Sequence, residues 1–127
     1  MDADLLIRSL PIDENVKQKY TPDIAYVEQF LADRGITVNE SVAYMFYNHL
    51  FAFLDRISHG ECSQTLEEED VRDQLTDEAC ALARELAAPL FFKYGIEANE
   101  CEEILLATYF VMFLEQQPDQ TDTPNRT

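Results

Sequence analysis

Apolar residues recur at helical spacing along most of the chain, and two stretches of this pattern are near copies of each other. The first copy, residues 35–54, reads GITVNESVAYMFYNHLFAFL, and the second, residues 95–114, reads GIEANECEEILLATYFVMFL. In each copy a glycine can end one helix, an asparagine can cap the next, and an apolar helix follows. The identities fall sixty positions apart and pair Gly35 with Gly95, Ile36 with Ile96, Asn39–Glu40 with Asn99–Glu100, and Phe53–Leu54 with Phe113–Leu114. The pattern therefore predicts a duplicated pair of helices.

The first copy belongs to a predicted helical hairpin at residues 21–58. Its first helix starts at Thr21, which suits the N-cap and precedes a proline, and the helix ends at Gly35. Its second helix begins after Thr37 or Asn39 and runs to about Ser58. One apolar stripe follows this helix and consists of Val42, Met45, Phe46, His49, Phe53 and Ile57. The mixed residues before this hairpin are expected to hold a short helix around 3–9 or 13–19.

The second copy belongs to a predicted hairpin at residues 76–117. Its first helix starts at Thr76 and runs to Tyr94, and Pro89 is expected to kink or split it. Its second helix starts at Asn99, which resembles a capping box together with Glu102, and ends near residue 117.

These elements predict an all-α fold, a helical bundle of two pseudo-repeated antiparallel hairpins within one domain, residues 1–117. A chain of 127 residues with 46% hydrophobic content suits one core, and only three glycines favour helices. Because each hairpin has one apolar side, the two are expected to pack face to face. The acidic stretch 60–75 is expected to be a solvated join between them, and residues 118–127 a disordered polar tail.

The net charge of −16 limits the partners. A surface this acidic repels phosphate backbones and anionic lipid headgroups, which argues against direct nucleic-acid binding and against membrane binding. The first residues lack the basic start and long apolar run of an export signal, so the chain is expected to be cytoplasmic. Three cysteines at scattered spacing, Cys62, Cys80 and Cys101, indicate free thiols, because they match neither a disulfide framework nor a zinc pattern. No cofactor and no metal site are expected.

Few residues offer chemistry. The sequence has no glycine-rich phosphate loop, no nucleophile elbow and no Glu-x-x-His motif of di-iron bundles. His49 lies on the apolar stripe, where a hydrogen-bonded core histidine is the commoner role. Tyr109 holds the matching position in the second copy and, if buried, needs a partner for its hydroxyl. His59 precedes Gly60 at a helix C-terminus, where the helix dipole favours a cation, so a capping role is expected there.

The stretch NHLFAFLDRISHG around His49 resembles the histidine signature of the PTS regulation domain family, abbreviated PRD. In that signature an arginine follows the histidine by seven residues and a glycine follows four residues later, and here these are Arg56 and Gly60. The stretch EEILLATYFVMF resembles the second signature of the family, a glutamate followed seven residues later by a histidine. Here Glu102 matches, whereas Tyr109 occupies the histidine position.

The resemblance implies an all-helical, often dimeric regulatory domain whose histidines are phosphorylated by the sugar phosphotransferase system. Such domains belong to regulators of carbohydrate genes, and this chain resembles a stand-alone copy. On that basis His49 is the expected phosphorylation acceptor, phosphocarrier proteins are the expected partners, and the chain is not expected to be an enzyme. Arg56 lies two helical turns from His49, so an arginine from another helix or subunit is the better candidate to hold an added phosphate.

Self-association, most simply as a homodimer, is also expected. The second helix carries four further large apolar residues outside its main stripe, more than one small bundle is expected to cover: Tyr44, Tyr47, Leu50 and Phe51. Two other interpretations stay open from the sequence. One is a purely structural helical interaction module without phosphoryl input, for which Tyr109 is the main argument. The other is a small helical enzyme or metal protein.

Overall fold

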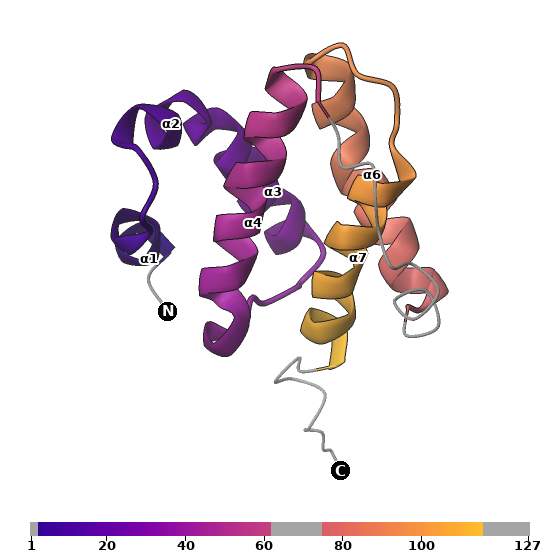
Figure 1. Cartoon of the computed structure of the whole chain (residues 1–127). Helices are drawn as coiled ribbons and strands as arrows, with labels where there is room; N and C mark the ends of the chain where they lie inside the picture. The colour runs from indigo at the N-terminus through magenta and orange to yellow at the C-terminus, as the bar shows by residue number, and fades with distance from the viewer. Residues whose placement is uncertain (1–2, 62–74, 116–127) are drawn as a thin grey trace.

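The computed structural model describes residues 3–61 and 75–115, and these residues form helices joined by short connections (Figure 1). The helices are α1 (Ala3–Ser9), α2 (Glu14–Lys19), α3 (Thr21–Asp33), α4 (Glu40–Ser58), α6 (Asp77–Lys93) and α7 (Glu100–Glu115). The described part of the chain contains no strand, so the predicted all-α fold is confirmed. Most of the predicted acidic join and the whole predicted tail lie outside the described residues.

The two hairpins repeat each other with an offset of sixty residues. Helix α3 ends at residue 33 and α6 at residue 93, while α4 begins at residue 40 and α7 at residue 100. Gly35 and Gly95 both have left-handed φ angles, 67° and 70°, which a residue with a Cβ adopts only with strain. The next amide in each copy donates back into the helix, Ile36 to the Leu31 carbonyl and Ile96 to the Phe91 carbonyl, both at 2.9 Å. The same glycine stop therefore ends both first helices, as the sequence predicts.

The two hairpins face each other and are related by an approximate twofold axis. Two residue pairs exactly one repeat apart are in contact: the His49 and Tyr109 rings, with centroids 5.5 Å apart, and the Tyr26 hydroxyl, which donates to the Leu86 carbonyl at 2.9 Å. A residue meets its own counterpart only where a twofold axis passes between the two copies. The predicted face-to-face packing of the hairpins is therefore confirmed.

Helices α4 and α7 run antiparallel along this contact, as Figure 1 shows. Residues later in α4 meet residues earlier in α7, and Phe46, before His49, meets Phe113, after Tyr109, with ring centroids 5.0 Å apart. Phe46, Phe53, Phe110 and Phe113 are all fully buried, so aromatic rings fill the centre of the bundle. Each edge-to-face ring pair adds about 1 kcal/mol beyond the area that it buries.

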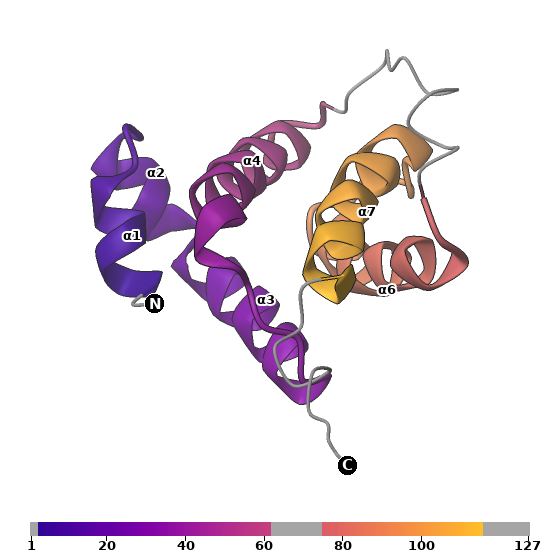
Figure 2. The same cartoon turned by 90° about the horizontal axis from the view of Figure 1, so that it is seen from below.

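Helices α1 and α2 cover the side of α4 that faces away from α7, which is clear when the molecule is seen from below (Figure 2). This arrangement corrects one expectation from the sequence. Tyr47, Leu50 and Phe51 were expected to exceed what the bundle covers, but each is at most 2% exposed. The short N-terminal helices supply the missing cover, and of the four residues in question only Tyr44 remains exposed.

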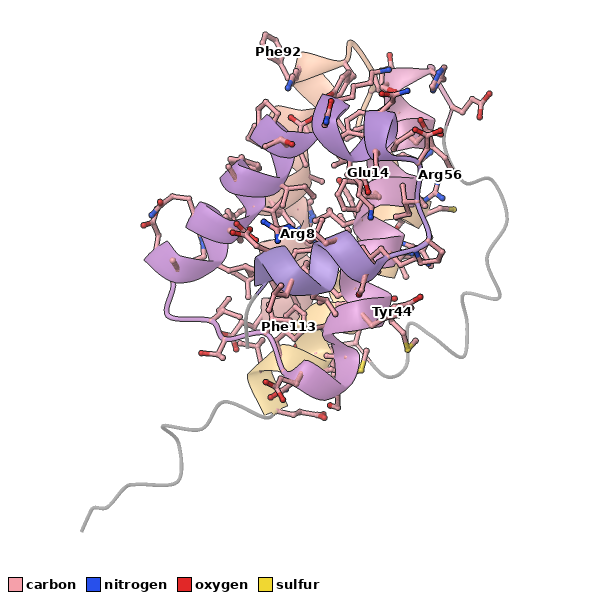
Figure 3. All side chains as sticks on the ribbon, turned by 90° about the vertical axis from the view of Figure 1, so that its left-hand side faces the viewer. Arg8, Glu14, Tyr44, Arg56, Phe92 and Phe113 are labelled. Carbon is pink, nitrogen blue, oxygen red and sulfur yellow. The ribbon has the colours of Figure 1, made fainter. Side chains whose placement is uncertain are left out.

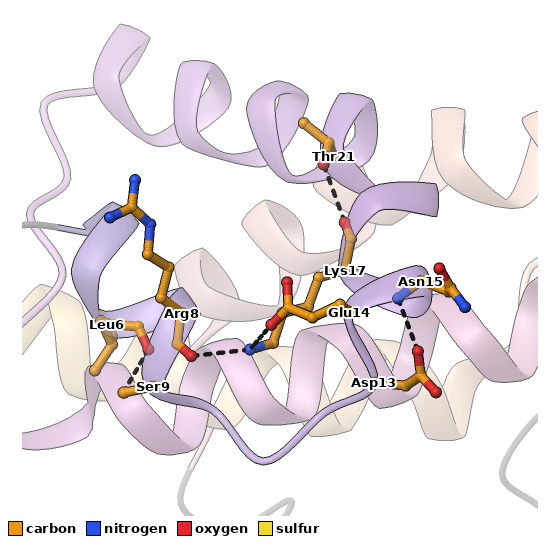
Figure 4. Close-up of polar contacts among 8 residues, drawn as sticks. All are labelled: Leu6, Arg8, Ser9, Asp13, Glu14, Asn15, Lys17 and Thr21. Atoms are coloured by element: carbon orange, nitrogen blue, oxygen red, sulfur yellow. Dashed lines mark hydrogen bonds and ion pairs between the residues drawn. The ribbon is translucent and has the colours of Figure 1, made fainter.

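Polar contacts around Lys17 connect α2 to α1 and to α3 (Figure 4). The Lys17 ammonium group is buried and donates to the Arg8 carbonyl oxygen at 3.1 Å and to the Glu14 carboxylate at 3.4 Å. Thr21 was predicted to be the N-cap of α3, but Tyr20 holds that position and Thr21 is the first helical residue. The reason is that α2 leads almost directly into α3, and the Thr21 hydroxyl donates backward to the Lys17 carbonyl at 3.0 Å.

Two further local predictions need correction. Pro89 was expected to kink or split α6, and the split does not occur, because α6 is one helix, Asp77–Lys93. Buried residues on both sides of the proline, such as Leu86 and Leu90, keep both turns on the core, so the loss of one amide donor is tolerated. Met45 was placed on the apolar stripe of α4, but its side chain is 58% exposed, because this position lies at the edge of the contact with α7.

Candidate functional site

Four of the residues singled out from the sequence lie along the contact between α4 and α7: His49 and Arg56 on α4, and Glu102 and Tyr109 on α7. We call this group the seam cluster. His49 and Tyr109 form its middle, with their rings tilted by 44° to each other. The Nε2 atom of His49 is buried and has no hydrogen-bond partner in the part of the chain that the structure describes. A buried polar atom without a partner is uncommon in proteins and points to a functional role or to a local rearrangement.

The surroundings of His49 favour its neutral form. Burial lowers the pKa of the imidazole below its ordinary value of 6.5, because a charged ring loses hydration between the helices. The positive charge of Arg56 lowers the same pKa further, while the negative charge of Glu102 acts in the opposite direction. At neutral pH the ring is therefore uncharged and keeps the lone pair of one nitrogen available.

Arg56 and Glu102 form a bidentate ion pair across the contact between α4 and α7. The Arg56 Nε donates to Glu102 Oε2 at 2.8 Å, and Nη2 donates to Oε1 at 2.7 Å. The Glu102 side chain is 0% exposed, whereas that of Arg56 is 28% exposed. Removing one partner of such a buried pair typically costs about 3–5 kcal/mol, because the remaining charge is left in a poorly hydrated place. The pair therefore links the two hairpins at this end of the seam.

The position of Glu102 corrects half of the predicted capping box. The Asn99 side chain does cap α7, since its Oδ1 accepts from the Glu102 amide at 3.0 Å. The Glu102 carboxylate, however, does not turn back to the Asn99 amide but reaches across to Arg56. An arginine fork satisfies both carboxylate oxygens at once, which a single backbone amide cannot do.

Tyr109 closes the seam beside His49. Its side chain is 8% exposed, and its hydroxyl donates to the Met45 carbonyl oxygen at the long distance of 3.4 Å, so the predicted partner for this hydroxyl exists. Burial raises the pKa of the Tyr109 hydroxyl above its ordinary value of 10.0. The group is thus protonated at neutral pH and is a poor nucleophile.

Gly60 and His59 serve the end of α4 rather than the seam. Gly60 has a left-handed φ of 76°, and the following amide, that of Glu61, donates to the Arg56 carbonyl at 2.8 Å. His59 is the C-cap residue, and its Nδ1 lies 2.7 Å from the Asp55 carbonyl oxygen, so this nitrogen carries the hydrogen and donates it. The expected capping role of His59 is confirmed.

Sequence reasoning named all the members of the seam cluster but did not foresee the Arg56–Glu102 pair. The available signal was the register. If α4 and α7 run antiparallel and His49 meets Tyr109, then the residue seven places after His49 must meet the residue seven places before Tyr109. The resemblance was used to place each signature separately, so this pairing of the two signatures was missed.

Other features of the described residues carry less chemistry. Cys80 and Cys101 are free, as predicted, and Cys62 lies outside the described residues. Within residues 3–61 and 75–115, no group of three or more His, Cys, Asp or Glu side chains is arranged to hold a metal ion. In the same ranges no helix combines the length and the apolarity that crossing a bilayer requires.

Comparison with known families agrees with the architecture. The molecule is an all-α domain of two duplicated hairpins with a histidine at their contact, and the PRD domain model matches residues 24–112, more than half of the chain. The chain therefore belongs to the PRD domain family, which is regulatory and tied to phosphorylation by the phosphotransferase system. Helices α1 and α2 precede the matched residues. No curated protein and no solved structure matches the chain.

Proposed function

We propose that this protein is a regulatory interaction domain whose His49 accepts a phosphoryl group from a phosphocarrier protein of the sugar phosphotransferase system. The observation that carries the proposal is the state of His49. Its ring is held neutral, its Nε2 makes no competing hydrogen bond with the described residues, and it lies at the contact between two hairpins. A group added there acts directly on the packing of the hairpins, which is what a regulatory domain requires.

The transfer itself needs no base from this chain. The lone pair of the neutral ring attacks the phosphorus of the donor's phosphohistidine, one nitrogen–phosphorus bond forms and the donor's bond breaks. The His49 ring releases the proton of its other nitrogen to solvent and the released donor imidazole takes one proton up from solvent, so that protons balance. Tyr109 does not take part as an acceptor, because its hydroxyl is protonated at neutral pH.

The wider proposal places this domain in the cytoplasm, where it contacts phosphocarrier proteins and takes part in the control of carbohydrate-gene expression. Self-association as a homodimer belongs to the same proposal. Its support is narrower than the sequence suggested, because α1 and α2 cover most of the outer face of α4. Among the described residues, the large apolar side chains that stay exposed are Leu5, Tyr44, Met45 and Phe92, and Figure 3 shows Phe92 projecting from one end of the molecule.

The decisive test is phosphorylation with purified phosphocarrier proteins and phosphoenolpyruvate, followed by mass mapping under conditions that preserve phosphohistidine. The label is expected on His49 and is expected to disappear in His49→Ala. Tyr109→Phe and His59→Ala are the matched controls and should keep it. A label that persists in His49→Ala would refute the assignment of the acceptor.

A structural interaction module without phosphoryl input is the second candidate function, and one observation favours it. The Nε2 atom of His49 is buried in the closed seam, so a donor reaches it only when α4 and α7 separate locally. If no phosphocarrier labels the folded protein, this second function becomes the better account of the chain.

A further inference from the structure

We propose that phosphorylation of His49 draws Arg56 away from Glu102, and that the buried carboxylate left behind opens one end of the contact between α4 and α7. This inference rests on the proposed function and names the step that converts the modification into a change of shape. In it, Arg56 is a positioning residue that exchanges partners, and Glu102 is the group that makes the exchange costly for the closed form.

Arg56 itself replaces the arginine from another helix or subunit that the sequence favoured, because the structure places Arg56 and His49 along the same contact with α7. Arg56 follows His49 by seven residues, almost two full turns, so both side chains project from the same face of the helix toward α7. Helical side chains lean toward the helix N-terminus, and His49 lies in that direction from Arg56. The two groups already influence each other, since the charge of Arg56 acts on the His49 ring.

The added charge decides which anion Arg56 prefers. A phosphoryl group brings nearly two negative charges and three strong acceptor oxygens, whereas Glu102 offers one charge. An arginine fork binds phosphate and carboxylate with the same geometry, so the more highly charged group wins the competition. The phosphate also adds negative charge close to Glu102, which repels its carboxylate in a region that water does not reach.

When Arg56 moves away from Glu102, the closed form of the contact is destabilised, because the Glu102 side chain is 0% exposed. A buried carboxylate that loses its counter-ion must either take up a proton or gain water, and water enters only if the helices separate. The amide of Glu102 is held by the Asn99 cap, so the first turn of α7 moves together with the carboxylate.

At the opposite end of the same contact, neither the start of α4 nor any described residue of α7 is basic, so these two helices form no comparable pair there. One repeat away, the counterparts of Glu102 and Arg56 are Val42 and Gln116, which cannot form an ion pair. That end of the seam is instead closed by aromatic rings, with Phe46 packed on Phe113 and Phe113 packed on Phe110. The opening is therefore expected at the Arg56–Glu102 end, with the aromatic end acting as the hinge.

The experiment uses the full chain with His59→Ala, so that the exposed His59 ring cannot take the label, and His49 is phosphorylated by phosphoramidate, a small phosphoryl donor that needs no docking surface. Intact mass gives the labelled fraction, and hydrogen–deuterium exchange is compared between labelled and unlabelled protein. In the labelled protein we expect the first turns of α7 and the last turns of α4 to exchange about tenfold faster or more, with little change around Phe46 and Phe113.

Two double variants decide whether the ion pair carries the effect. Arg56→Gln with Glu102→Gln keeps the size and hydrogen-bonding capacity of both side chains but removes both charges, so neither is left as an unpaired buried charge. At equal labelled fraction this variant should lose the exchange response. Arg84→Gln with Glu103→Gln is the matched control, because it removes an opposite-charge pair of α6 and α7 outside the seam cluster, and it should keep the response.

A second readout follows the exchange of partners directly. The Nε–H group of Arg56 donates to Glu102, so its cross-peak in an NMR spectrum should shift on labelling of the His59→Ala protein. An equal exchange response in the Arg56→Gln and Glu102→Gln double variant, or no response and no shift in the labelled protein, would overturn the inference while the proposed function stands. If no donor labels His49, the proposed function is rejected, and this inference with it.

Discussion

Helices α3 and α6 end in the same way, on a left-handed glycine, yet the hairpins α3–α4 and α6–α7 present different side chains to each other. At the middle of the seam, His49 on α4 faces Tyr109 on α7. The first hairpin supplies the cation of the Arg56–Glu102 pair and the second supplies the anion. The comparison shows that helix stops and buried apolar residues preserve a duplicated backbone, while the polar side chains at the contact are free to diverge.

The capping asparagines make the same comparison on a smaller scale. Asn99 accepts from the Glu102 amide, whereas the side chain of Asn39 makes no capping bond to α4 and its Nδ2 is buried without a partner in the described part of the chain. The same residue at the same repeat position thus has a local role in one hairpin only.

The largest expected effect comes from Arg56→Ala. It removes the arginine from the buried Glu102 carboxylate, and we expect the free energy of unfolding to fall by about 3–5 kcal/mol. Urea denaturation monitored by circular dichroism measures the change. Glu85→Ala is the matched control, because Glu85 is exposed and pairs with Arg34 at 3.4 Å, and its removal leaves Arg34 stacked on the Phe30 ring. That loss should be below about 1 kcal/mol. Equal losses of unfolding free energy in the two variants would show that the Arg56–Glu102 pair stabilises the fold no more than an exposed ion pair does.

The next effect tests whether the duplication extends to energetics. Gly35→Ala and Gly95→Ala each place a Cβ at a left-handed φ, with no atom within 4 Å that the new methyl group would meet. The cost is therefore backbone strain alone, about 1–2 kcal/mol at each position. The same denaturation experiment should give equal losses for the two variants. A difference much larger than the experimental error would mean that one of the two helix stops depends on its surroundings.

The third effect separates the two asparagines. Asn99→Ala removes the bond that caps α7 and should cost about 1 kcal/mol. Asn39→Ala removes no capping bond and also removes a buried amide group without a partner, so it should be neutral or slightly stabilising. Thermal unfolding of the two variants side by side checks the order, and an Asn39→Ala variant that is the less stable of the two would contradict it.

Much of the fold could be read from the sequence, because the signals that define it are local. The glycine stops after α3, α4 and α6 and the periodic apolar residues of α4 and α7 all predict helices without knowledge of the tertiary structure. The predictions that were wrong depend on contacts across the molecule. Tyr47, Leu50 and Phe51 needed α1 and α2 as a cover, and α6 is not split at Pro89 because the core holds both of its sides.

In the candidate site, too, the local features were predicted from the sequence and the long-range contacts were not. The sequence and its resemblance named His49, Arg56, Glu102 and Tyr109, but their common location depends on the antiparallel register of α4 and α7. Local rules assigned the Glu102 carboxylate to its own helix start, because a capping box is a short-range pattern. Arg56, a partner distant in sequence with two donors, binds this carboxylate in place of the backbone amide, and no local rule predicts that contact.

The smallest expected effect concerns pH and contrasts the two residues at the middle of the seam. Burial and Arg56 lower the pKa of His49 below 6.5, so between that folded-state pKa and 6.5 the unfolded chain binds more protons than the folded one. Stability is therefore expected to fall as the pH drops through 6.5, and this part of the loss should disappear in His49→Phe. Tyr109→Phe removes a hydroxyl that does not titrate in this range, because its pKa is raised above 10.0, so it should keep the loss. Chemical denaturation at about pH 7.5 and about pH 5.5 measures the difference, and an identical pH dependence in His49→Phe would show that His49 is not held neutral by the seam.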